Sequence, residues 1–179
     1  MKLIYYVLHI ILTFYLFIYS MMCRFQISVR WGGEKIMDKS HVAELFMRGQ
    51  DCSQVVFSHC AHELGISPED ANRLTASFGG GSGIGETCGA VIGALMVIGM
   101  KHGHSGPDDM EQRTILMEKR SEFLRKWNEK RGTCMCRDFL RHDITQPGEF
   151  EKVIEEGTMF SLCPELVLDA LEILNDMSD

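Results

Sequence analysis

The strongest structural signal in this chain is the segment TCGAVIGALMVIGMK, residues 87–101. Thr87 is a residue type that caps helix N-termini, and apolar residues cover all sides of the helix that follows, from Cys88 to Lys101. Such a helix is expected at the buried centre of a helical protein, and it is too short to span a membrane. Gly89 and Gly93 share one face, so a neighbouring helix can approach closely there.

Helical spacing of apolar residues continues on both sides of this segment, and no β-strand pattern stands out. Asp51 and Ser67 are typical helix caps, and Gly65 and Gly132 are typical stops. We therefore expect an all-α fold, a compact bundle of about six to seven short helices around an apolar central helix. Besides the central segment, helical patterns cover residues 38–47, 52–64, 67–78, 108–130, 133–141, 149–156 and 164–177.

The N-terminal leader, residues 1–36, differs from the rest of the chain. Residues 3–22 are almost entirely apolar and long enough to span a bilayer. Two hypotheses stay open: the leader is a membrane anchor, or translation begins at Met37 and the leader is a mis-called start. The second rests on Gly32-Gly33-Glu34, which a purine-rich ribosome-binding sequence would encode. Residues 37–179 form the helical domain in both cases.

Composition and charge narrow the class of protein. The net charge of the 179 residues is −7, which argues against a nucleic-acid partner. Seven cysteines are many for this length, but they lack the even count and short spacing of a secreted disulfide scaffold. We expect reduced thiols in a cytoplasmic protein. If residues 3–22 are translated and inserted, the basic residues after them place the domain on the cytoplasmic side of the membrane.

Four of the cysteines stand where predicted helices begin: Cys52, Cys88, Cys136 and Cys163. The unpaired N–H groups and partial positive charge of a helix N-terminus favour the thiolate, which is both the nucleophile and the metal ligand. Cys60 falls in the middle of a predicted helix, where a small buried hydrophobic role is the better interpretation. The four helix-start cysteines are therefore the candidate site, provided that they meet in space.

Three kinds of function fit this cysteine set. The first is a thiol–disulfide oxidoreductase in which Cys88 attacks and Cys136 or Cys52 resolves the mixed disulfide, with an unknown redox partner. The second is an electron carrier in which Cys52, Cys88, Cys136 and Cys163 hold an iron–sulfur cluster or another metal. The third is a helical interaction module in which the thiols only pack. The sequence leaves the choice and the cofactor open.

A glycine-rich loop, residues 79–85, precedes the central helix. It lacks the Gly-Lys-Ser/Thr ending of a P-loop, and it follows a predicted helix rather than a strand. We expect glycines such as Gly85 and Gly89 to give access to whatever Cys88 binds or attacks. The glycine-lined helix itself can pack within the chain or across a homodimer.

The segments around the four helix-start cysteines resemble those of a known protein family. Residues 51–54, 78–94, 136–140 and 163–164 resemble, in order, the four motifs of the C_GCAxxG_C_C family of redox-active proteins. The resemblance runs from about Ser40 to Leu174 and implies a redox-active cysteine set without naming a substrate. Some relatives are similar to the helical part of split-Soret cytochromes. This chain has no Cys-x-x-Cys-His motif, so the resemblance does not imply that it binds haem.

Overall fold

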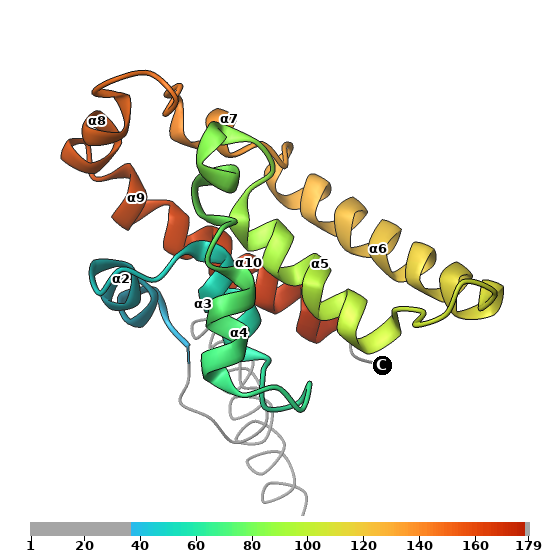
Figure 1. The fold of residues 1–179 in the computed structure, drawn as a ribbon. Helices are drawn as coiled ribbons and strands as arrows, with labels where there is room; N and C mark the ends of the chain where they lie inside the picture. Colours follow the sequence, from blue (N-terminus) through green and yellow to red (C-terminus); the bar gives the residue numbers. More distant parts are fainter. Residues whose placement is uncertain (1–36, 178–179) are drawn as a thin grey trace, which may run out of the picture.

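The computed structural model describes residues 37–177, which form nine α-helices and no strand (Figure 1). The all-α prediction is confirmed, although the described residues hold more helices than the six to seven expected, because short one- and two-turn helices join the longer ones. The helices are α2 (Lys39–Met47), α3 (Cys52–His59), α4 (Pro68–Thr75), α5 (Gly89–His102), α6 (Met110–Arg131), α7 (Cys136–Leu140), α8 (Glu149–Glu155), α9 (Thr158–Ser161) and α10 (Cys163–Asp176).

The leader lies outside the described residues, so both hypotheses about residues 1–36 stay open. Within residues 37–177, none of the helices combines the length and the apolar character that crossing a bilayer requires.

Local capping explains where several helices begin. The Asp38 carboxylate accepts a hydrogen bond from the His41 backbone N–H at 2.8 Å, and the Ser67 hydroxyl accepts one from Asp70 N–H at 3.1 Å. At α3, the Gln54 side chain reaches back to accept from the Asp51 N–H at 2.8 Å. These bonds satisfy donors that a helix leaves free in its first turn.

Two glycines of α5, Gly89 and Gly93, contact α3 of the same chain. A Cβ atom at Gly93 would lie 2.9 Å from the carbonyl oxygen of Ser53, and one at Gly89 would lie 3.2 Å from the Ser53 backbone nitrogen. Only glycine allows the two backbones to come this close. The close approach expected from the sequence is therefore used inside the chain.

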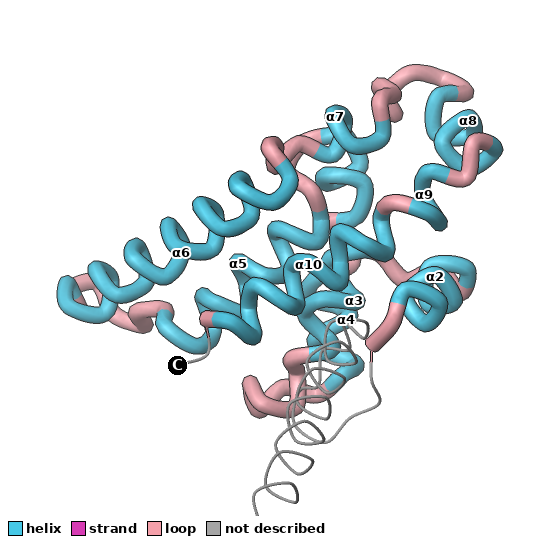
Figure 2. Tube along the Cα trace, turned by 180° about the vertical axis from the view of Figure 1, so that it is seen from behind, coloured by secondary structure: helices cyan, strands magenta, loops and turns pink. Residues whose placement is uncertain are grey.

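The helix α10 has more neighbours than the predicted central helix. It packs against α2, α3, α5, α6 and α9, whereas α5 packs mainly against α3, α6 and α10 (Figure 2). Val91, Ala94 and Val97 of α5 are buried, but Met100 is exposed, so this helix is not covered on all sides as its composition suggested.

The end of α6 positions α7. Trp127 is fully buried and its indole N–H donates to the Thr133 carbonyl at 2.8 Å. Its ring also meets the Phe139 ring edge to face, with centroids 6.2 Å apart. The long helix is thereby tied to the segment that carries Cys136.

Candidate functional site

The four candidate cysteines stand at helix starts in the structure. Cys52, Cys136 and Cys163 are the first residues of α3, α7 and α10, and Cys88 is the N-cap of α5. The four thiols are close enough to interact electrostatically, since Cys88, Cys136 and Cys163 each raise the pKa of Cys52. These starts meet at one place, which the sequence could not show.

A short backbone link joins the starts of α5 and α7. Thr87 and Met135 form an isolated antiparallel β-bridge. On either side of it, the Cys88 N–H donates to the Cys134 carbonyl and the Cys136 N–H donates to the Glu86 carbonyl, both at 2.7 Å. This link holds Cys88 and Cys136 together although they are far apart in sequence.

Gly89 brings the start of α5 to the start of α3. A Cβ atom at Gly89 would lie 3.3 Å from the Cβ of Cys52 and 2.8 Å from the Phe78 carbonyl oxygen. The role of Gly89 is thus close helix contact, which places Cys88 behind Cys52.

Cys52 and Cys163 are the two site thiols whose pKa values depend most strongly on each other. The Cys52 thiol donates a hydrogen bond to the Cys163 sulfur, which lowers the pKa of Cys163 below its ordinary value of 9.0. The same hydrogen bond, together with burial, raises the pKa of Cys52 well above that value. The pair therefore shares a hydrogen-bonded proton, and the interaction favours the thiolate on Cys163 over the thiolate on Cys52.

The other two thiols do not have the acidity expected from their positions. Burial raises the pKa of Cys88 and of Cys136 to about 12. The nearby backbone N–H groups of Ala90 and Val91 lower the pKa of Cys88, but loss of hydration outweighs them. The prediction that each helix start makes its cysteine acidic is therefore wrong for Cys52, Cys88 and Cys136.

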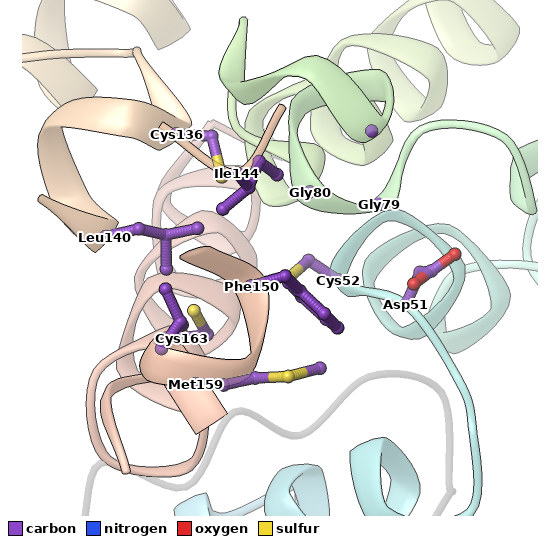
Figure 3. Close-up of a pocket in the computed structure, with 12 residues that line it drawn as sticks. Asp51, Cys52, Gly79, Gly80, Cys136, Leu140, Ile144, Phe150, Met159 and Cys163 are labelled. Atoms are coloured by element: carbon purple, nitrogen blue, oxygen red, sulfur yellow. The ribbon is translucent and has the colours of Figure 1, made fainter. Parts of the chain in front are cut away.

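A pocket of about 400 Å³ lies against three of the four thiols. Figure 3 shows the side chains of Cys52, Cys136 and Cys163 reaching it from α3, α7 and α10. Cys88 is 2% exposed and does not line it. The remaining lining is Asp51, Gly79, Gly80, Gly83, Leu140, Ile144, Phe150, Val153 and Met159.

The glycine-rich loop forms one wall of this pocket through residues other than those expected. Gly79, Gly80 and Gly83 line the cavity, whereas Gly85 and Gly89 do not. Gly85 adopts a left-handed conformation with φ of 73°, and its carbonyl accepts from the Arg137 side chain at 3.2 Å. This hydrogen bond fixes the loop against α7. Glycine suits the position because a side chain at this φ would be strained.

The other two cysteines of the described residues, Cys60 and Cys134, do not line the pocket. Cys60 is fully buried and burial raises its pKa to about 12, consistent with a packing role, while Cys134 is half-buried. All six cysteines in the described part of the chain are free thiols. Among residues 37–177, no three His, Cys, Asp or Glu side chains form a group arranged to hold a metal ion.

Several pocket residues gave no functional signal in the sequence. Asp51 was expected only as a helix cap, yet it also lines the pocket. Phe150 and Met159 come from α8 and α9, whose contribution depends on how the chain folds back over Cys163. The position of Asp51 directly before Cys52 was the one hint available.

Fold and site define a class of all-α proteins built around a cysteine centre at converging helix starts. Residues 50–177 match the family model C_GCAxxG_C_C, described as "Putative redox-active protein", and the chain belongs to this family. No curated protein and no solved structure matches the chain.

Proposed function

We propose that this domain is a thiol–disulfide redox protein whose working pair is Cys52 and Cys163. The observation that carries the proposal is that Cys52 and Cys163, from two different helix starts, line the same pocket, where the interaction of their side chains lowers the pKa of Cys163. A thiolate with a neighbouring protonated thiol is the arrangement that thiol–disulfide exchange needs.

The exchange balances with a disulfide as oxidant. The Cys163 thiolate attacks one sulfur of the substrate disulfide, forms a mixed disulfide and releases the first substrate thiolate. Cys52 then loses its proton and attacks the Cys163 sulfur, which forms the Cys52–Cys163 disulfide and releases the second thiolate. Two electrons pass to the substrate, and the two released thiolates take up protons.

Cys163 replaces Cys88 as the attacking thiol in this proposal. Cys88 is buried behind the pocket, and its pKa of about 12 leaves it protonated at neutral pH. Cys136 lines the pocket but has the same raised pKa. Both remain neutral neighbours of the pair and take no step in the reaction.

The test is to react the fully reduced protein with bis(2-hydroxyethyl) disulfide and map the disulfides by peptide mass spectrometry. We expect a Cys52–Cys163 bond in the wild type. Cys52→Ser should instead accumulate the mixed disulfide on Cys163, because the resolving thiol is gone. Cys134→Ser is the matched control, since Cys134 is a half-buried thiol outside the pocket, and it should behave as the wild type.

Metal analysis of protein purified without oxygen, together with the thiol reactions above, distinguishes the other two functions. A protein purified without oxygen that carries stoichiometric iron and absorbs in the visible region would overturn the proposal in favour of a cluster on the cysteines. No reaction of any thiol, with no metal present, would favour a packing role. A disulfide that excludes Cys163 would also contradict the proposed pair.

A further inference from the structure

The pocket beside the proposed thiol pair has the size and lining of a small-molecule site. Its volume of about 400 Å³ falls in the range of ligand pockets in proteins. Much of the lining is apolar and comes from Leu140, Ile144, Phe150, Val153 and Met159. A ligand that fills it would remove apolar surface from water, which favours an apolar group.

The charge of the pocket restricts the ligand further. Among residues 37–177, Asp51 is the only lining residue with a carboxyl group, and no Lys, Arg or His side chain of this range contributes to the lining. None of the described basic residues forms an ion pair with Asp51. Burial raises the pKa of this carboxyl from its ordinary value of 3.8, because water hydrates it incompletely.

The Asp51 carboxylate occupies space that is free because Gly79 has no side chain. A Cβ atom at Gly79 would lie 2.2 Å from the Asp51 carboxyl carbon, so any larger residue there would displace the carboxylate. The start of α3 carries Asp51 and Cys52 in succession, so the negative charge stays next to the thiol pair. An anionic substrate would meet this charge without a compensating cation.

We propose that the substrate of this site is a small disulfide with an apolar substituent and no negative charge. The inference rests on the thiol–disulfide function proposed above and names its substrate class. The apolar substituent lies against Phe150 and Met159 while one of its sulfurs meets the Cys163 thiolate. The attacking and leaving groups, and the two electrons transferred, are those of the exchange already described.

The test measures second-order rate constants for oxidation of the reduced protein by three disulfides. Dibenzyl disulfide is neutral and apolar, bis(2-hydroxyethyl) disulfide is neutral and polar, and 3,3′-dithiodipropionate is anionic. Each rate constant is divided by that for free cysteine under the same conditions, which removes intrinsic reactivity. We expect the corrected rates to fall in that order.

Two exposed apolar side chains on α8 provide a matched pair of variants. Phe150 and Ile154 are 41% and 42% exposed, but only Phe150 lines the pocket. Phe150→Ala should slow oxidation by dibenzyl disulfide about five- to tenfold by removing part of an aromatic contact, and should slow oxidation by the hydroxyethyl compound less. Ile154→Ala should change neither rate.

The charge is tested with Asp51→Asn, because Asn is also a good helix cap and preserves the start of α3. This variant should accelerate oxidation by dithiodipropionate about fivefold, the effect of removing one partly screened charge. The rate with the uncharged hydroxyethyl compound should change less.

The outcomes separate the two proposals. If no disulfide oxidises the protein, the thiol–disulfide function itself fails. If all three oxidise it with equal corrected rates, and Phe150→Ala matches Ile154→Ala, the function stands and the proposed substrate class is overturned. A preference for the anionic compound would likewise overturn it.

Discussion

At the scale of single residues, the acidity of a thiol in this protein depends on two opposing effects. The first backbone amides of α5 favour the thiolate of Cys88, yet burial raises its pKa to about 12. Cys163 is also buried, but the Cys52 thiol donates to it and lowers its pKa. A helix start therefore does not by itself make a thiol acidic when water is excluded.

This contrast leads to a prediction for the Cys52→Ala variant. Removing the Cys52 thiol takes away the donor that stabilises the Cys163 thiolate, so the pKa of Cys163 should rise. The rate of Cys163 alkylation by iodoacetamide, followed by mass spectrometry as a function of pH, should shift to higher pH. The Cys134→Ser variant should keep the wild-type profile. An unchanged profile in Cys52→Ala would contradict the shared proton.

At the scale of elements, the contact between α3 and α5 depends on glycine. Gly93→Ala would put a Cβ atom 2.9 Å from the Ser53 carbonyl oxygen, and backbone atoms cannot move aside easily. We expect a loss of about 1–3 kcal/mol in the free energy of unfolding, measured by urea denaturation.

Gly99 on the same helix is the control for this prediction. A Cβ atom at Gly99 would have no neighbour within 4 Å. Gly99→Ala should therefore stabilise the protein, by about 0.5–1 kcal/mol, because alanine is the better helix former. Equal effects of the two substitutions would show that helix propensity, rather than close packing, determines the result.

The helix α8, which supplies Phe150 and Val153 to the pocket, is held by one histidine. The His142 Nδ1 lies 2.8 Å from the Glu149 carboxylate, and its Nε2 lies 3.0 Å from that of Glu156. Glu149 and then Glu156 raise the pKa of His142 above its ordinary value of 6.5. The imidazolium therefore connects the end of α7 to both ends of α8.

This contact predicts a pH dependence with a definite sign. Because the pKa of His142 is raised in the folded chain, its stabilisation is fully present below pH 6.5 and is lost as the pH rises through the raised value. The melting temperature of the wild type should exceed that of His142→Gln at about pH 6, and the difference should shrink at about pH 9. A difference independent of pH would rule out the charged contact.

At the scale of the whole molecule, an ion-pair network fixes the long helix α6 against α10. Asp169 of α10 is only 7% exposed, and it pairs with Arg131 and with Lys130, the latter at 2.9 Å. The network connects two segments that carry site cysteines. Arg131 ends α6, shortly before Cys136, and Asp169 lies on α10, the helix that Cys163 begins.

Breaking this network should cost more than breaking a surface pair. Asp169→Ala would leave two cations without their buried partner, and we expect a loss of about 1–3 kcal/mol in the free energy of unfolding. Glu129→Ala removes the exposed pair with Arg125 on α6 and should cost less than about 0.5 kcal/mol. Comparable losses in both variants would contradict a special role of the buried carboxylate.

The sequence predicted most of the helices, because their start and stop signals are local. Asp38 and Ser67 cap helices as expected, and α5 begins and ends within a residue of its predicted bounds. The one-turn helix α9 was missed, since four residues carry no periodic pattern. The predicted helix over residues 52–64 ends early, at His59.

By itself the sequence determined the all-α class, the positions of the four cysteines at helix starts and the glycines that permit close helix contact. Each of these depends on neighbours a few residues away along the chain. Only the tertiary structure decided which thiol is acidic, which helices line the pocket and where Asp51 points. Hydration, electrostatic field and cavity shape arise from segments distant in sequence, so they exist only once the helices have packed.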